Sequence, residues 1–91
     1  VALSERAEDM TEKFVHVFKA GFVSMDMAQN ILVIKTVSGM AMAVAAALDA
    51  MQLHEIVGCI AGDDTIMCAA KNSDMALGAA EKLRSFVRLN M

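Results

Sequence analysis

Two adjacent carboxylates, Asp63 and Asp64, are the side chains of this sequence best suited to binding a ligand. Adjacent carboxylates at the end of a strand point apart, so each can accept hydrogen bonds from a different cationic group. A guanidinium offers a planar fork of N–H donors to one carboxylate, and an ammonium can bind the other. Gly62 followed by two Asp residues is, however, also the ordinary composition of a tight hairpin turn. The residues alone therefore leave both interpretations open: a simple turn, or a site for a doubly cationic ligand.

The other reactive side chains predict neither a catalytic nor a metal site. His16 and His54 lie far apart in the sequence and have no carboxylate at ligand spacing. Cys59 and Cys68 match neither a CxxC motif nor a zinc-binding spacing, and no general base or oxyanion site accompanies them. We therefore expect no metal, no cofactor and no enzyme activity. The histidines are expected to be solvated or structural, and the cysteines to lie in the core.

The elements that position the Asp pair follow from hydrophobic periodicity and turn residues. Residues 1–20 predict a linker or a short helix that ends at Gly21, and residues 21–91 predict one domain. Two helices on one face of a four-stranded sheet, in the order ββαββα, make a two-layer α/β (α+β) sandwich. The predicted strands are Phe22–Met27, Ile31–Val37, Ile56–Ala61 and Thr65–Ala70, and the predicted helices are Met40–Met51, capped by Ser38, and Asp74–Leu89, capped by Ser73.

The predicted hairpin also pairs the cysteines. A turn centred between Asp63 and Asp64 places Cys59 directly opposite Cys68 on neighbouring strands. A disulfide between directly opposed strand residues is strained. No signal peptide and no apolar run of bilayer-spanning length is recognisable, which indicates a cytoplasmic protein without membrane contact. Because the cytoplasm is reducing, we expect two free thiols.

The composition indicates that copies of the chain associate. Of the 91 residues, 57% are hydrophobic, which is more apolar material than one core of this size can hide. The helix predicted over Met40–Met51 is apolar except for Asp49, and a helix that is apolar all round must be buried on all sides. The strand Ile31–Val37 is apolar on both faces except for Lys35 and Thr36, and Lys35 is expected to be a solvated or paired charge at the rim. By contrast, a net charge of −3 with dispersed Lys and Arg argues against a free-standing nucleic-acid-binding domain.

Two segments resemble the C-terminal domain of bacterial arginine repressors. Residues 58–66 (GCIAGDDTI) are similar to the family's GT-I-x-GDDT-I signature, and residues 34–42 (IKTVSGMAM) to its K-T-x-P-G-x-A-Q segment. Phe22–Asp26 resembles the family's first strand, and the resemblance extends over about residues 21–89. It implies the ββαββα fold, with residues 21–91 as an effector-binding and oligomerisation domain that forms trimers. Two trimers would stack into a hexamer with the corepressor L-arginine between them, and a separate N-terminal module would bind DNA.

The resemblance also assigns six ligand-binding residues: the acidic pair, the backbone before it, and the helix start that faces the ligand. These are, in that order, Asp63 and Asp64, Ala61 and Gly62, and Ala41 and Met42. Two positions depart from the family pattern, since Ser38 replaces a Pro and Met42 replaces a Gln. Met cannot donate an amide hydrogen bond, which leaves open a purely structural oligomerisation module that has lost ligand binding. A small enzyme or metal site built on the Asp pair is the remaining alternative, but no further polar constellation accompanies the pair.

Overall fold

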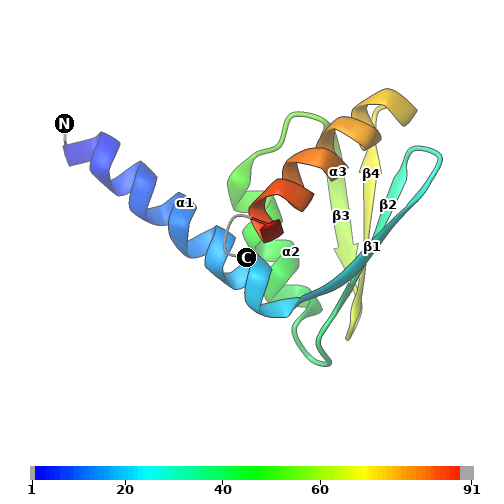
Figure 1. The fold of residues 1–91 in the computed structure, drawn as a ribbon, viewed down its shortest axis with the longest axis horizontal. Helices are drawn as coiled ribbons and strands as arrows, with labels where there is room; N and C mark the ends of the chain where they lie inside the picture. The colour runs from blue at the N-terminus through cyan, green and yellow to red at the C-terminus, as the bar shows by residue number, and fades with distance from the viewer. Residues whose placement is uncertain (1, 89–91) are drawn as a thin grey trace.

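A computed structural model describes residues 2–88, with side chains from residue 12 onward. After a first helix, the chain follows the predicted order ββαββα, and the two-layer α+β architecture is confirmed (Figure 1). Helices α2 and α3 lie on one face of the four-stranded sheet. The elements are α1 (Ala2–Gly21), β1 (Phe22–Ala28), β2 (Ile31–Thr36), α2 (Ala41–Met51), β3 (Ile56–Ala61), β4 (Thr65–Ala70) and α3 (Ser73–Arg88).

The sheet is antiparallel throughout, with the strand order β1-β2-β4-β3. The inner strands β2 and β4 pair with Ile34 opposite Ile66, and both side chains are fully buried under the helices. Alternate residues of the two strands point into the core, as the twofold period of a strand requires. The remaining core comes from the two covering helices and the end of α1, and its buried members include Phe18, Leu32, Val44, Leu48, Cys68, Ala79, Ala80 and Leu83.

Helix α1 is longer than the short helix or linker predicted for residues 1–20, and it projects from the body of the molecule (Figure 1). Its last turn belongs to the core, because Phe18 is fully buried and its ring centroid lies 5.3 Å from that of Phe22. The helix ends at Gly21, as predicted. A Cβ atom at this position would lie 2.6 Å from Cγ2 of Val44, so glycine lets α1 approach α2 closely.

Both predicted helix caps are wrong. Helix α2 begins at Ala41, with Met40 at the N-cap position and no side-chain cap, so Ser38 lies too early in the chain to cap it. Helix α3 begins at Ser73, and Oδ1 of the preceding Asn72 accepts a hydrogen bond of 2.8 Å from the N–H of Met75. That bond to the third helical residue is the N-cap interaction. Asn72 therefore caps α3, one residue before the predicted position.

The strand boundaries also differ by one residue at two places. Strand β1 continues through Ala28, and strand β2 ends at Thr36 instead of Val37. Thr36 is buried at the edge of the core, whereas Val37 is exposed in the loop that follows. The pairing of Phe22 with Thr36 marks the last contact between the two strands.

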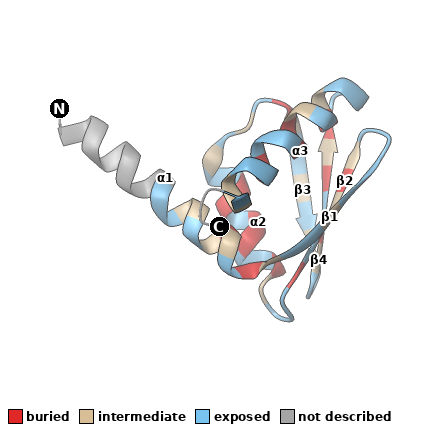
Figure 2. Cartoon of the chain, viewed as in Figure 1, coloured by how far each residue is buried: buried red, intermediate tan, exposed pale blue. Residues whose placement is uncertain are grey.

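No helix of residues 2–88 covers the second face of the sheet, and large apolar side chains are exposed on it. Figure 2 shows exposed residues along much of β1 and β3, in contrast to the buried residues of α2. The exposed fractions are 79% for Ile60, 68% for Val57 and 53% for Met67. No helix within the described part of the chain is both long and apolar enough to cross a membrane.

Candidate functional site

The turn that carries the two carboxylates is fixed against the loop between β2 and α2 by backbone hydrogen bonds. The carbonyl oxygen of Asp63 accepts from the N–H groups of Gly39 (3.1 Å) and Ala41 (3.2 Å). The carbonyl oxygen of Asp64 accepts from the N–H of Thr36 at 2.7 Å. The loop can turn back to make these bonds because Gly39 adopts a φ of +82°, which favours glycine. The two segments that carry the family resemblance therefore meet at one end of the sheet.

The carboxylates themselves bind neighbouring hydroxyl groups. Oγ of Ser38 donates to Oδ2 of Asp63 at 3.2 Å, and Oγ1 of Thr65 donates to Oδ1 of Asp64 at 3.0 Å. Thr65 in turn accepts a hydrogen bond of 2.9 Å from Nζ of Lys35, its partner in the strand register. Both aspartates are exposed. Since an ionised carboxylate accepts about four hydrogen bonds, each retains acceptor capacity for a ligand.

The remaining predicted site residues lie at the same end of the molecule. Ala61 is half-buried at the end of β3, and the N–H of Gly62 closes the hairpin by donating to the carbonyl of Thr65 at 2.8 Å. Ala41 is fully buried, so only its backbone takes part, through the bond to Asp63. The side chain of Met42 is 73% exposed at the start of α2. The structure thus groups all six predicted residues.

Two residues of this site escaped the sequence analysis. Ser38 was predicted to cap a helix, but its hydroxyl instead donates to the carboxylate of Asp63. Lys35 was expected only to be a solvated or paired charge at the rim, and in the structure its Nζ is linked to Asp64 through the Thr65 hydroxyl. The signal for Lys35 was available once the strands were placed side by side, because Lys35 and Thr65 are direct partners across β2 and β4.

The second polar cluster of the described residues lies between α3 and the loop before β3. Glu55 is buried, and its Oε2 accepts an ion-pair hydrogen bond of 2.6 Å from Nζ of Lys82 on α3. This bond lowers the pKa of the Glu55 carboxyl from its ordinary value. Nδ1 of His54 lies 3.5 Å from Oε1, the carboxylate oxygen that has no hydrogen-bond partner among the described residues. The cluster joins two elements and is a structural ion pair.

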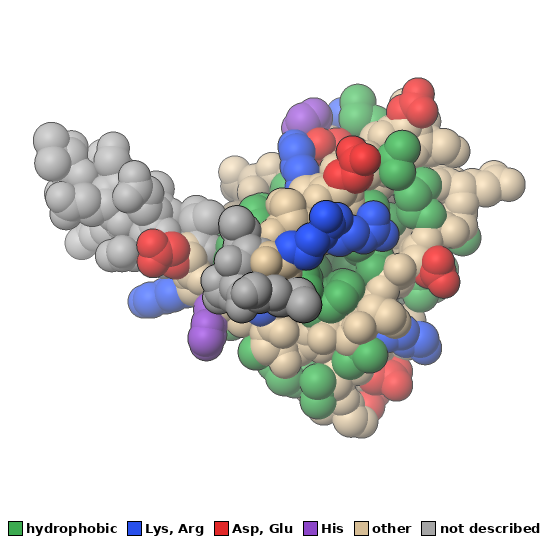
Figure 3. All heavy atoms as spheres, viewed as in Figure 1, with side chains coloured by type: hydrophobic (Ala, Val, Ile, Leu, Met, Phe, Trp, Pro, Cys, Tyr) green, Lys and Arg blue, Asp and Glu red, His purple; other side chains and the backbone are tan. Residues whose placement is uncertain are grey.

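The basic residues of α3 do not form a separate site. Among Lys82, Arg84 and Arg88, the first is held by Glu55. On the face shown in Figure 3, blue and red side chains lie interspersed over the helices, beside green apolar patches. Such a mixed pattern differs from the concentrated basic patch that a nucleic-acid-binding surface requires.

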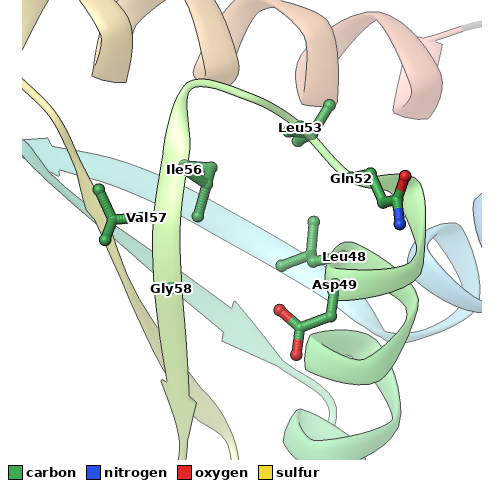
Figure 4. A pocket seen from close by; sticks show the side chains of 7 residues that line it. All are labelled: Leu48, Asp49, Gln52, Leu53, Ile56, Val57 and Gly58. Atoms are coloured by element: carbon green, nitrogen blue, oxygen red, sulfur yellow. The ribbon is translucent and has the colours of Figure 1, made fainter.

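A cavity of about 180 Å³ lies between the C-terminal end of α2 and β3, away from the aspartate turn. Figure 4 shows apolar side chains of Leu48, Leu53 and Ile56 around it, with the carboxylate of Asp49 and the amide of Gln52 also on its lining. None of the predicted site residues lines this cavity. Among the described residues, no three His, Cys, Asp or Glu side chains gather where they could hold a metal ion.

The cysteines lie as the hairpin register predicts. Cys59 on β3 is the direct partner of Cys68 on β4, and the two sulfur atoms are 3.0 Å apart. Both are free thiols in the structure.

Comparison with known proteins places this geometry in a family. The sequence pattern of the family "Arginine repressor, C-terminal domain" matches residues 18–85. A protein named "Arginine repressor" from Lachnoclostridium phytofermentans is 54% identical over 90 residues, which cover 99% of this chain and 59% of that protein. Proteins of the same name from Lachnospira eligens and Caldicellulosiruptor bescii are 59% and 41% identical, covering 88% and 93% of this chain.

The chain spans between 53% and 59% of the length of these three relatives. These relatives are named as repressors, which are regulatory proteins and not enzymes. The match over residues 18–85 includes α2, the whole sheet and the turn with both aspartates. The chain therefore belongs to the family of arginine repressor C-terminal domains.

Proposed function

We propose that this chain is the L-arginine-binding and assembly domain of a cytoplasmic transcriptional repressor of arginine metabolism, with L-arginine as its corepressor. The proposal is supported by membership of the family and by the name of its relatives. The chain covers little more than half of those relatives, so DNA binding is assigned to a module of the parent protein that lies outside this sequence.

The observation that carries the proposal is the rigid presentation of two exposed carboxylates. The turn is fixed to the start of α2 through the carbonyl of Asp63 and to the end of β2 through the carbonyl of Asp64, so the two residues keep a defined separation and direction. L-arginine carries two cationic groups, a guanidinium and an α-ammonium. A planar guanidinium binds one carboxylate with paired N–H donors, and the ammonium binds the other.

The ligand's α-carboxylate needs donors as well, and the start of α2 is suited to supply them. The first N–H groups of a helix lack partners within the helix and favour anions. The N–H of Ala41 already donates to Asp63, so we assign this role to the amides that follow, beginning with Met42. Ala61 and Gly62 form the backbone wall beside the carboxylates.

Assembly and ligand binding are coupled in this proposal. The chain forms trimers, and two trimers stack with their aspartate turns facing each other. Carboxylates brought together without a ligand repel, and L-arginine inserted between the trimers replaces that repulsion with bridges. Binding therefore stabilises the hexamer, and the hexamer in turn binds the ligand more tightly than separate trimers do.

One observation favours a second candidate function, a structural assembly module without a ligand. Met42 is exposed where the family pattern has a Gln, and a thioether cannot donate the amide hydrogen bond. The chain would then keep the fold and the interfaces while Asp63 and Asp64 serve only as turn residues.

Isothermal titration calorimetry with L-arginine separates the two functions. L-citrulline is the matched control ligand, because it replaces the charged guanidinium with a neutral ureido group of nearly the same shape. We expect saturable binding of L-arginine and at least about ten-fold weaker binding of L-citrulline, since a charge-assisted hydrogen bond is lost. Absence of heat with L-arginine up to millimolar concentration would instead establish the structural module.

A further inference from the structure

The contact between Cys59 and Cys68 has a geometry that suits reversible covalent chemistry. The two residues are direct partners in adjacent antiparallel strands, and their Sγ atoms lie 3.0 Å apart. Two side chains that only pack against each other would not bring their sulfur atoms this close. It holds the two sulfur atoms in position before any reaction occurs.

The position of the pair in the ladder brings the two backbones close as well. The N–H of Gly62 donates to the carbonyl of Thr65, which makes this pair a hydrogen-bonded position. Such positions alternate with non-hydrogen-bonded ones along an antiparallel ladder. Three steps away, Cys59 and Cys68 therefore occupy a non-hydrogen-bonded position, where Cα atoms are about 4.5 Å apart. That separation lies at the short end of the range of about 4.4–6.8 Å that a disulfide bridges.

The two thiols differ in their surroundings, which gives each a distinct role. Cys68 lies in the core at 1% exposure, and its hydrogen bond with Cys59, followed by burial, raises the pKa of its thiol. Cys59 is only half-buried and lies on β3, one of the two edge strands of the sheet. Its pKa is lowered, because the S–H of Cys68 can donate to the Cys59 thiolate. Cys59 is therefore the thiol that reagents reach and that ionises first.

We propose that Cys59 and Cys68 form a reversible thiol–disulfide site that reacts with low-molecular-weight disulfides of the glutathione class. The Cys59 thiolate attacks one sulfur of the reagent RSSR, which gives a Cys59–S–SR mixed disulfide and releases one thiolate RS⁻. Cys68 then loses its proton and attacks Sγ of Cys59, which forms the bond between the strands and releases the second RS⁻. Two protein thiols are oxidised, and the reagent is reduced to two RSH after both leaving groups take up protons.

The site returns to free thiols when the surroundings are reducing. A bond between directly opposed strand residues is strained, and strained disulfides have less reducing potentials than ordinary structural ones. An excess of the reduced thiol RSH therefore reverses both steps. Formation of the bond uses only Cys59, Cys68 and the reagent, so it does not depend on whether the chain binds L-arginine.

The test uses the full chain without L-arginine, equilibrated with mixtures of oxidised and reduced glutathione, quenched with acid and alkylated after unfolding. Intact-mass spectrometry should show a monomer that has lost two hydrogens and accepts no alkyl group in oxidised mixtures. Excess reduced glutathione should restore both alkylation sites. The proposal is overturned if the native chain keeps two free thiols in mixtures that oxidise the unfolded chain, or if its products are stable glutathione adducts or covalent dimers.

A matched pair of variants tests the separate roles. Cys68→Ala removes the second thiol, so it should accumulate a single glutathione adduct on Cys59. Cys59→Ala leaves only the buried thiol, which should react at least about ten-fold more slowly while the chain is folded, in line with its burial. Equal rates for the two variants would refute the assignment of Cys59 as the attacking thiol. Circular dichroism verifies folding, and Cys68→Val replaces Cys68→Ala if the smaller side chain does not fold.

Discussion

Substitutions of Asp63 and Asp64 can distinguish a residue that only forms a turn from one that binds a ligand. Their backbone carbonyl groups hold the turn in place, and their side-chain carboxylates each accept a hydrogen bond from a neighbouring hydroxyl. The shape of the turn therefore depends on the backbone, and its charge on the side chains. A hydroxyl group can donate to an Asn side-chain oxygen as well as to an Asp one. Replacing either Asp with Asn therefore preserves the turn while it removes the charge.

We predict that Asp63→Asn and Asp64→Asn each fold and assemble like the parent chain but bind L-arginine more weakly. Losing a charge-assisted hydrogen bond costs about 1.5–3 kcal/mol, which corresponds to roughly ten- to a hundred-fold in affinity. Calorimetric titration measures the change. Asp26→Asn, an exposed carboxylate on β1, is the matched control and should leave the affinity unchanged. Parent-like affinity in both turn variants would show that these residues are turn formers only.

Met42 offers the converse test, a gain of affinity. Its side chain is exposed at the start of α2, so a polar group of similar length can be placed there without disturbing the core. Met42→Gln restores an amide donor and should strengthen L-arginine binding by about 0.5–1.5 kcal/mol, the usual net value of one hydrogen bond. Met42→Leu, which is apolar and of similar size, should bind like the parent chain. Equal affinity of the Gln and Leu variants would exclude a contact from this position.

At the level of residues, the sequence predicted which segments form the candidate site but not which side chains are hydrogen-bonded to each other there. The resemblance brought residues 34–42 and 58–66 to one site, and the backbone bonds from Gly39 and Ala41 to Asp63 join them. The role of Ser38 could not be predicted, because it depends on the helix starting three residues later, at Ala41. Glu55 gave no signal either, since nothing in a polar loop shows that one carboxylate will be buried under a helix.

At the level of elements, the Glu55–Lys82 pair joins the loop before β3 to α3 and makes the stability of the fold depend on pH. The folded-state pKa of Glu55 lies below its ordinary value of 4.5. The pair therefore contributes stability above about pH 4.5, and this contribution is lost as the pH falls through the folded-state pKa.

We predict that Glu55→Gln lowers the thermal midpoint most at neutral pH, and that its difference from the parent chain shrinks as the pH falls below 4.5. Circular dichroism melts across this range measure the effect. Glu81→Gln, an exposed carboxylate on α3 beside Lys82, serves as the control and should shift the midpoint little at any pH. A difference between Glu55→Gln and the parent that stays constant with pH would rule out the ion pair as its cause.

The contact between α1 and α2 gives a second prediction at this scale. Gly21 lets the helices approach, because a Cβ atom would lie 2.6 Å from Cγ2 of the fully buried Val44. Gly21→Ala should therefore destabilise the fold by about 1–3 kcal/mol through overpacking, as measured by urea denaturation. Gly58→Ala is the matched control, because its Cβ would meet no atom within 4 Å. Val44→Ala in the Gly21→Ala background should offset part of the loss, and failure to do so would refute the steric explanation.

The order of the elements was predictable, and the extent of α1 was not. Runs of β-branched residues such as Ile31–Val37 and the Gly-Asp-Asp turn predict the strands, and each strand boundary lies within one residue of its predicted position. Helix α1 has a charged and weakly apolar sequence, which predicts a linker as readily as a helix. Its end is fixed by tertiary contacts of Phe18 and Gly21, and such contacts are not visible in local periodicity.

At the scale of the whole molecule, composition predicted an excess of apolar surface, and the structure locates it. The helices cover one face of the sheet, and Val57, Ile60 and Met67 stand exposed on the other. Composition alone could not show whether the excess apolar surface lies on this sheet face or on the helix over Met40–Met51, which was expected to need a neighbouring subunit. In the structure α2 alternates between buried and exposed residues, with Ala41, Val44 and Leu48 inward.

The last prediction concerns assembly, and it follows from the open sheet face. We expect the chain to form trimers or hexamers at micromolar concentration in analytical ultracentrifugation, with L-arginine shifting the population towards hexamers. Ile60→Glu places a charge on the exposed apolar face, where burial without a partner is costly, and should shift the chain towards monomers. Leu77→Glu, at an exposed apolar position on α3, is the control for a general effect of charge. Because Ile60 points away from the core, its substitution leaves the folded monomer intact, as circular dichroism can verify. A parent chain that sediments as a monomer with and without L-arginine would contradict the proposed assembly, and equal dissociation by both Glu variants would contradict the assignment of the interface to the sheet.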